Sequence, residues 1–390
     1  MMKKLLAALV LAIALVAVAA AVWRGSEKLA HKHELYGYID TTGAVAIKPR
    51  FWDAGPFVEG RAAVLVGRSC GYFNRNNCKW GFIDSTGTIV ISAKYRNVME
   101  FAEGLAAVEL CDKNNEDCLI GFVDRSGEMR IKPKYQRWAQ FSEGLAAVAS
   151  GRKCKDNSFT CEYSYVNYNG DIVIDGPFEE AAPFKEGIAA VKTNGKYGYI
   201  NKKGQTAIDF VYSDARPFSE GLAGVKTSYE NTGIAASGFI DKEGNTAVDM
   251  IYCEVGLFSE GHAPVSVCDN CLKKEGCRWG LVNREGELAF KAQFKAPRCF
   301  SEGLLPMDFD LGSAEGIKRG YVNAKGEVAI QPIFDRAWSF SEGFAQVESD
   351  GLILFIDKEG ETIIKAKGYR NVGHFSEGLA PAQTNGRPSR

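Results

Sequence analysis

Apolar and polar residues alternate along most of this chain in short runs that recur about every forty residues. The clearest copy occupies residues 79–108. It opens with the run Trp80–Asp84, turns at Gly87, alternates over residues 88–91, and reaches the element Phe-x-Glu-Gly at Phe101–Gly104. Alternation with a period of two predicts short strands that each bury one face.

The Phe-x-Glu-Gly element marks nine copies of this unit. Its glycines are Gly60, Gly104, Gly144, Gly187, Gly221, Gly261, Gly303, Gly343 and Gly378. Each copy also carries Asp or Asn three residues before a glycine, which predicts a hairpin turn. A unit of this size cannot bury a core alone and must pack against its neighbours. The pattern therefore predicts an all-β protein with three short antiparallel strands and one crossing loop per unit.

Two arrangements of the units are compatible with the order of the strands. The chain begins with a first strand at residues 36–40 and ends with a third strand at residues 378–382, so the last strand is able to complete the first unit and close a propeller-like ring. Nine units exceed the usual four to eight blades, and three strands are one fewer than a blade has. Pro381 also suits an exposed edge strand. We therefore predict an open, curved, solenoid-like array of nine units, with a closed propeller-like ring as the alternative.

The N-terminal residues 1–23 have the features of a targeting segment. Lys3 and Lys4 precede eighteen apolar residues, which fits a secretory signal peptide. The run is also long enough to span a bilayer, so an uncleaved membrane anchor at residues 5–23 is the alternative. In both cases the repeats are exported to the periplasm or the cell surface. We expect a polar lead at 24–35, a repeat domain at 36–384 and a tail at 385–390.

The co-occurrence of the Asp/Asn turn and Phe-x-Glu-Gly resembles the WG-repeat family of bacterial proteins. The resemblance runs from Tyr36 to Gln383. The Trp-Gly pair for which the family is named occurs only at Trp80-Gly81 and Trp279-Gly280. Other residues at the Trp position in the remaining units indicate a packing role for the Trp. The resemblance implies a repeat scaffold with a binding function and carries over no catalytic residues.

Eleven cysteines in an exported chain predict disulfides. Four pairs frame hairpins between units, and their register places the partners opposite each other at the base of a loop. These pairs are Cys70 with Cys78, Cys111 with Cys118, Cys154 with Cys161, and Cys268 with Cys277. Among the remaining three, Cys253 with Cys299 is the predicted pair and Cys271 the free thiol. No zinc site is expected at Cys268 and Cys271, since no second Cys-x-x-Cys and no suitably spaced His follow.

Charge and aromatic residues narrow the functional possibilities. The formal net charge is -1, so the chain has no basic footprint for nucleic acid. We expect the repeated Glu of Phe-x-Glu-Gly to accept backbone N–H groups of the neighbouring unit, fixing the angle between units. Trp52, Trp138 and Trp338 precede Phe-x-Glu-Gly elements, where they either cover the crossing loop or form a surface for sugars or partner side chains.

No Ser/His/Asp or Cys/His set shares a local context in the sequence. We therefore predict a non-enzymatic scaffold that binds a protein or glycan of the cell envelope. It is expected to need no cofactor or metal, and to meet the membrane only through an uncleaved N-terminal segment. Two alternatives remain: an envelope glycan hydrolase that uses repeat carboxylates, and a purely structural spacer.

Overall fold

The computed structural model describes residues 34–68, 70, 78–112, 117–150, 161–227, 236–269, 271, 275–294, 300–312 and 316–385. These residues form strands and connecting turns, as the alternating pattern predicts. No helix in the described ranges is long and apolar enough to cross a membrane. The predicted signal or anchor at residues 1–23 and most of the polar lead lie outside the described residues.

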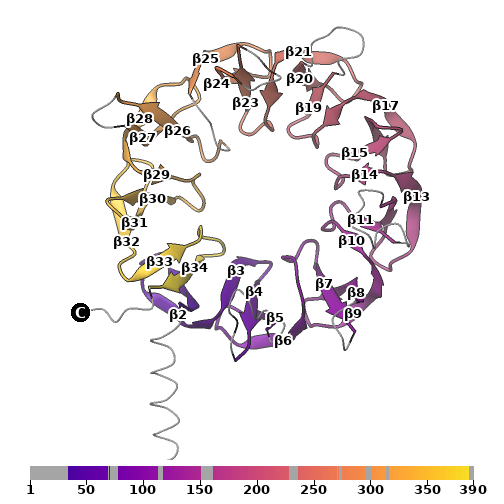
Figure 1. Cartoon of the computed structure of the whole chain (residues 1–390), viewed down its shortest axis with the longest axis vertical. Helices are drawn as coiled ribbons and strands as arrows, with labels where there is room; N and C mark the ends of the chain where they lie inside the picture. Colours follow the sequence, from indigo (N-terminus) through magenta and orange to yellow (C-terminus); the bar gives the residue numbers. More distant parts are fainter. Residues whose placement is uncertain are drawn as a thin grey trace, which may run out of the picture.

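The strands form nine small antiparallel sheets arranged in a ring, which are the blades of a β-propeller (Figure 1). Blade 1 contains β3 (Asp53–Val58), β4 (Arg61–Val66), β5 (Lys79–Ile83) and β6 (Ile89–Tyr95). Blade 2 contains β7 (Leu105–Cys111), β8 (Cys118–Asp124) and β9 (Met129–Tyr135). Blade 3 contains β10 (Arg137–Trp138), β11 (Ala146–Ala149), β12 (Tyr163–Val166) and β13 (Ile172–Phe178). Blade 4 contains β14 (Glu180–Ala181), β15 (Ile188–Thr193), β16 (Lys196–Asn201) and β17 (Thr206–Tyr212).

The remaining blades follow the same order. Blade 5 contains β18 (Asp214–Ala215), β19 (Ala223–Lys226), β20 (Ser237–Ile240) and β21 (Thr246–Tyr252). Blade 6 contains β22 (Glu254–Val255), β23 (His262–Val267), β24 (Arg278–Asn283) and β25 (Leu288–Phe294). Blade 7 contains β26 (Leu305–Asp310), β27 (Ile317–Val322) and β28 (Val328–Phe334). Blade 8 contains β29 (Arg336–Ala337), β30 (Ala345–Ser349), β31 (Leu352–Ile356) and β32 (Thr362–Lys365). Blade 9 contains β33 (Tyr369–Val372), β34 (Leu379–Thr384), β1 (Tyr36–Asp40) and β2 (Val45–Phe51).

Blade 9 closes the ring, so the predicted open solenoid is wrong and its alternative is correct. Strand β34 pairs with β1 from Tyr36↔Gln383 to Asp40↔Leu379, which joins the two ends of the chain in one sheet. Pro381 does not mark a free edge, since it lies inside this pairing. Its carbonyl accepts the Gly373 N–H at 2.8 Å, on the side of β33. The proline nitrogen points to that same side, so no hydrogen bond toward β1 is lost.

Most blades have a fourth strand that the pattern did not predict. The crossing segment contributes a short innermost strand, only two residues long in β10, β14, β18, β22 and β29. In blade 2 an isolated bridge between Val98 and Val108 takes its place. Two residues are too few to show a period, which is why the sequence predicted three strands per unit.

The core lies in the seams between blades. At eight seams an aromatic residue of the third strand of one blade meets the Phe of the next Phe-x-Glu-Gly element, and at the seam between blades 6 and 7 Leu281 takes its place against Phe300. Phe82 contacts Phe101 and Tyr199 contacts Phe218 edge to face, both with ring centroids 5.0 Å apart. Such buried rings contribute about 1.5–3 kcal/mol each by removal of apolar area from water. The strands β6, β13, β17 and β21 lie on the outer rim of the ring (Figure 1).

The glycine of the Trp-Gly pair permits a close approach of the outer strand. A Cβ added at Gly81 would lie 2.6 Å from the Ile91 carbonyl oxygen and 2.8 Å from the Ala93 nitrogen. The register of β5 and β6 shifts at this point, as in most other blades. Blade 8 has Leu354 at the equivalent position, and there Leu354 pairs directly with Lys365 in the shorter strand β32. Blade 8 therefore departs from the repeat in its backbone as well as in its sequence.

Candidate functional site

The nine Phe-x-Glu-Gly turns form a continuous hydrogen-bonded belt around the ring, here called the glutamate belt. Its members are Glu59, Glu103, Glu143, Glu186, Glu220, Glu260, Glu302, Glu342 and Glu377 with the glycines that follow them. The Glu59 carboxylate accepts the Gly104 N–H of the next blade at 2.9 Å. Glu377 accepts the Gly60 N–H at 2.9 Å and so completes the circle. The prediction that these carboxylates bind backbone N–H groups of the neighbouring unit is confirmed.

Serine and basic side chains reinforce the glutamate belt. In six blades the residue before Glu is Ser, and its hydroxyl donates to the Phe carbonyl of the next blade, as Ser142 does to Phe184 at 2.7 Å. Arg125 forms an ion pair with Glu59 at 2.6 Å. Burial raises the pKa of Glu59, but the hydrogen bonds from Arg125 and the Gly104 N–H outweigh it, and the net pKa is lowered. The Glu59 carboxylate is therefore a structural acceptor held in its ionised form.

The seam between blades 8 and 9 contains a pocket of ≈ 620 Å³. Its walls come from the crossing segment and β30 of blade 8, from β31, and from the crossing segment of blade 9. The lining residues are Trp338, Ser339, Phe340, Ser341, Phe344, Gln346, Phe355, Val372, Gly373 and His374. This volume lies within the range of about 300–1,000 Å³ that is typical of small-ligand sites.

The pocket is built from residues that depart from the repeat. Trp338 stands where blades 4 and 5 have Ala182 and Arg216. Phe344 follows a Phe-x-Glu-Gly glycine, a position held by a leucine in blades 2, 3 and 5. Gln346 replaces the alanine found in blades 1 to 4. Phe344 and Gln346 therefore differ from the most common residue at their positions and line one cavity, together with Trp338, whose position varies from unit to unit.

The seam with the pocket is one of five that lack a tyrosine hydroxyl; the others have Phe82, Phe122, Phe239 and Leu281 at the equivalent position. At four seams a buried Tyr donates to a carbonyl of the next crossing segment; in blade 7, Tyr321 donates to the Trp338 carbonyl at 2.7 Å. Blade 8 has Phe355 at this position, and Gly373 is its counterpart of Trp338. Since phenylalanine has no hydroxyl, this bond cannot form at the seam between blades 8 and 9.

Gln346 is the buried polar residue of the pocket. It is 8% exposed, and its carbonyl accepts the Trp338 N–H at 3.0 Å. Its side-chain amide has no hydrogen-bond partner among the described residues. The Ser341 hydroxyl, in contrast, is engaged by donation to the Phe375 carbonyl at 2.9 Å. Among the described residues that line the pocket there is no Asp, Glu, Lys or Arg.

The three tryptophans predicted as a surface are not brought together. Trp52 lies in blade 1, where its indole N–H donates to the Gly67 carbonyl at 2.9 Å. Trp138 packs against the core between blades 2 and 3. Only Trp338 lines the pocket. Phe344, Gln346, Phe355 and His374 also line the pocket and were not predicted; a comparison of the aligned units shows the first two as departures from the most common residue.

Disulfides join the two ends of hairpin loops, at the point where the third strand of a blade begins. The structure joins Cys70 to Cys78, Cys111 to Cys118, and Cys268 to Cys277. Cys161 is also disulfide-bonded, and its predicted partner Cys154 lies outside the described residues.

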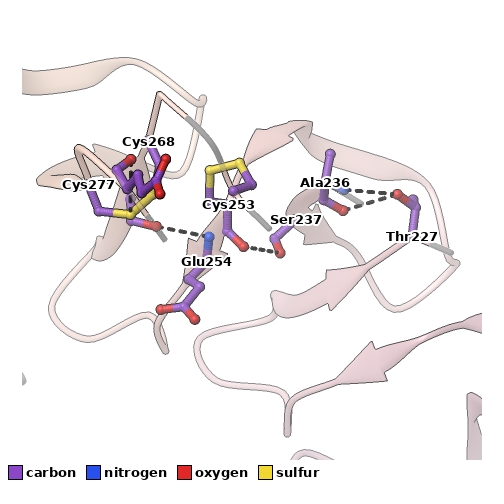
Figure 2. Close-up of a disulfide and its surroundings, with 10 residues drawn as sticks. Thr227, Ala236, Ser237, Cys253, Glu254, Cys268 and Cys277 are labelled. Carbon is purple, nitrogen blue, oxygen red and sulfur yellow. Dashed lines mark hydrogen bonds between the residues drawn. A yellow bond between two sulfur atoms is a disulfide. The ribbon is translucent and has the colours of Figure 1, made fainter. Parts of the chain in front are cut away.

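The predicted pair of Cys253 with Cys299 is wrong, because Cys253 is joined to Cys271 (Figure 2). The Cys253 N–H donates to the Ser266 carbonyl at 2.9 Å, which places Cys253 beside the hairpin that carries Cys271. Both cysteines therefore belong to blade 6, whereas the prediction had looked for a partner in the adjacent unit. Cys299 lies outside the described residues. Within the described part of the chain, no group of three or more His, Cys, Asp or Glu is placed to hold a metal ion.

Comparison with known proteins identifies the repeat. The family model for the WG containing repeat matches residues 36–68, 80–113, 120–154, 163–197, 197–228, 238–270, 279–307, 320–352 and 355–387. No curated protein matches the chain.

Solved structures share the architecture at low sequence identity. A crystal structure of a eukaryotic initiation factor is similar with a TM-score of 0.53 and 9% identity, over 92% of this chain and 100% of that chain. An acylaminoacyl peptidase from Pyrococcus horikoshii has a TM-score of 0.39 and 11% identity, over 77% of this chain and 57% of its own. Apo AztD from Citrobacter koseri has a TM-score of 0.36 and 10% identity, over 90% and 99%. The initiation factor supports the fold alone, and the two lower scores carry no argument.

Proposed function

The chain belongs to the WG-repeat family, and from that premise we propose that it is an exported, non-enzymatic binding scaffold of the cell envelope. Its fold is a ring of nine blades, and the partner is a protein or glycan of the envelope. The observation that carries the proposal is the seam between blades 8 and 9, where departures from the repeat converge on one pocket. A purely structural spacer would give no reason for such an asymmetry.

The glutamate belt supports binding over glycan hydrolysis. A glycosidase needs two carboxyl groups free to act as acid and as base or nucleophile. The belt carboxylates instead accept N–H groups of the next blade, and Glu143 and Glu186 also form ion pairs with Lys202 and Lys242, each at 3.0 Å. The pocket itself is lined by aromatic and neutral polar side chains.

The disulfides support export. Intramolecular disulfides persist in oxidising compartments and are rare in the cytosol. A reporter that is active only outside the cytoplasm, fused after Arg390, should therefore be active. An active cytoplasmic reporter at the same position would contradict export.

Affinity capture tests the binding function. The full chain, Trp338→Ala and Arg216→Ala are used to capture partners from an envelope fraction, with a mass-spectrometric readout. Arg216 is a matched control, because it occupies the position of Trp338 in blade 5 and its carbonyl also accepts a tyrosine hydroxyl. A partner retained by wild type and Arg216→Ala and lost by Trp338→Ala is expected. Equal recovery on all three proteins would contradict the pocket as the binding site.

A further inference from the structure

We propose that the pocket between blades 8 and 9 binds an uncharged sugar ring, one pyranose unit of a glycan. This inference rests on the proposed binding function and names the class of its ligand. Three properties of the pocket carry it: aromatic walls, the Gln346 amide without a hydrogen-bond partner among the described residues, and described lining residues that include no Asp, Glu, Lys or Arg.

The aromatic walls require an apolar face on the ligand. Phe340 and Phe355 are buried, and Trp338 and Phe344 are partly exposed beside them. A pyranose offers such a face, because its axial C–H groups form an apolar patch of about the area of an aromatic ring. Removing both surfaces from water favours their contact.

The buried amide requires a ligand that also donates and accepts hydrogen bonds. The Gln346 amide has one acceptor and two donors, and none of them bonds to a described residue. Gln346 lies on β30, which pairs with β31 from Ala345 to Ser349. A sugar hydroxyl both donates and accepts, so it is able to satisfy this amide. A hydrocarbon chain or a phenylalanine side chain has no group that could.

The described lining residues include no Asp, Glu, Lys or Arg, which argues for a neutral ligand. Anionic sugars and phosphates are commonly held by Arg or Lys, and neither residue type lines the pocket. His374 is exposed in the crossing segment of blade 9, where it offers a further polar contact at the opening.

The walls are held in place before a ligand arrives. The Tyr321 hydroxyl fixes the Trp338 carbonyl at 2.7 Å. On the opposite wall a Cβ at Gly373 would lie 2.8 Å from Pro381 Cγ, so this backbone packs closely on β34. A preorganised pocket loses less entropy on binding, which favours measurable affinity for a single sugar unit.

Isothermal titration of the full chain with maltose, cellobiose and N,N′-diacetylchitobiose tests the inference, with N-acetyltryptophanamide as the aromatic-peptide probe. At least one disaccharide should bind. Trp338→Ala and Gln346→Leu should each weaken that binding by about tenfold or more, whereas Arg216→Ala should leave it within about twofold. Gln346→Leu replaces the amide by an apolar side chain that is one atom shorter, and circular dichroism confirms that each variant is folded.

The other outcomes overturn the inference. Binding of N-acetyltryptophanamide in a Trp338-dependent manner without binding of any disaccharide would assign the pocket to a protein side chain. The proposed scaffold function would survive that result. Binding of a disaccharide that is unchanged in both pocket variants would place the sugar elsewhere on the ring. No binding of any probe would remove the sugar assignment, while the capture experiment above would still decide the scaffold function separately.

Discussion

The seams on the two sides of blade 8 have the same packing of aromatic rings, but only the seam with blade 9 contains the pocket described above. Between blades 7 and 8, Tyr321 packs edge to face on Phe340 with centroids 5.1 Å apart, and its hydroxyl reaches the Trp338 carbonyl. Between blades 8 and 9, Phe355 packs on Phe375 with centroids 4.9 Å apart, and Phe355 has no hydroxyl to reach the next crossing segment. The second seam contains the pocket.

The glutamate belt is the same at both seams. Glu302 accepts the Gly343 N–H at 3.1 Å on one side of blade 8, and Glu342 accepts the Gly378 N–H at 2.9 Å on the other. The symmetric belt therefore fixes the angle between blades, and the layer above it is free to vary without opening the ring. A repeat protein can in this way acquire one asymmetric site at little cost in stability.

The largest loss of stability is expected from removal of a strand of blade 9, which forms one side of the seam with the pocket. A chain that ends at Gly378 lacks β34, which pairs with both β1 and β33. We expect loss of the cooperative unfolding transition, because the free energy of unfolding of a domain is only about 5–15 kcal/mol and the ring can no longer close. Thermal unfolding followed by circular dichroism measures this. A chain that ends at Asn385 is the control, and equal midpoints for both truncations would contradict closure through β34.

A smaller loss of stability, equal at the two seams, is expected when a carboxylate of the glutamate belt is removed. Glu302→Ala and Glu342→Ala each remove a carboxylate that binds backbone N–H groups, at a cost of about 1–2 kcal/mol. Glu302 also pairs with Lys358 at 3.2 Å, but that ion pair is exposed and adds at most about 0.5 kcal/mol. Chemical denaturation gives both values. A loss at only one seam would show that the belt is not the common frame.

The sequence predicted the parts of this frame that are local. Turns, hairpins and alternating strands depend on residues within one unit, and the Glu of each belt turn was recognised because it recurs at one offset. Ring closure was predicted only as an alternative, since it depends on pairing of Tyr36 with Gln383, at opposite ends of the chain. Alternation also misjudged the outer strands: Ile47 is 3% exposed, but Val45, two residues earlier, is 53% exposed.

The pocket could not be predicted because two blades build it. Gln346 and His374 belong to different units, and no motif links them. Trp338 was selected together with Trp52 and Trp138 as an aromatic group, although the three occupy different positions of the crossing segment. A comparison of the units position by position gives the signal that motifs do not: Phe344, Gln346 and Leu354 of blade 8 each differ from the most common residue at their position.

Two substitutions, Tyr321→Phe and Phe355→Tyr, test whether the aromatic residue at each seam accounts for the difference between them. Tyr321→Phe removes the hydroxyl from the seam between blades 7 and 8 and should cost about 1 kcal/mol, because the Trp338 carbonyl loses its partner. Phe355→Tyr adds a hydroxyl to the pocket seam, aimed at the carbonyl of Gly373. We expect unchanged or slightly higher stability and weaker ligand binding, since the added group occupies the cavity. Stronger ligand binding by Phe355→Tyr would contradict the expectation that the added hydroxyl occupies space used by the ligand.

The smallest expected effect is the pH dependence of stability that arises from the glutamate belt. Burial raises the pKa values of Glu59, Glu143 and Glu186, but hydrogen bonds from basic side chains and from backbone N–H groups outweigh it, and each net pKa is lowered. In the unfolded chain these groups take up protons near the ordinary Glu pKa of about 4.3. Their contribution to stability is therefore complete above that pH and is lost as the pH falls through the lowered pKa values of the folded state.

This linkage gives a measurable slope. The free energy of unfolding should fall from about pH 5 toward pH 3. Substitution of Glu59, Glu143 and Glu186 together by Gln should make this fall smaller by about 1 kcal/mol. The value is small because each carboxylate is partly screened by water. Gln at three exposed turn residues, Glu243, Glu285 and Glu359, is the matched control and should leave the slope in place. If both triple variants change the slope equally, net charge and not the belt governs acid stability. A flattened slope only in the first variant would identify the belt as the frame on which both the closed seam and the open one depend.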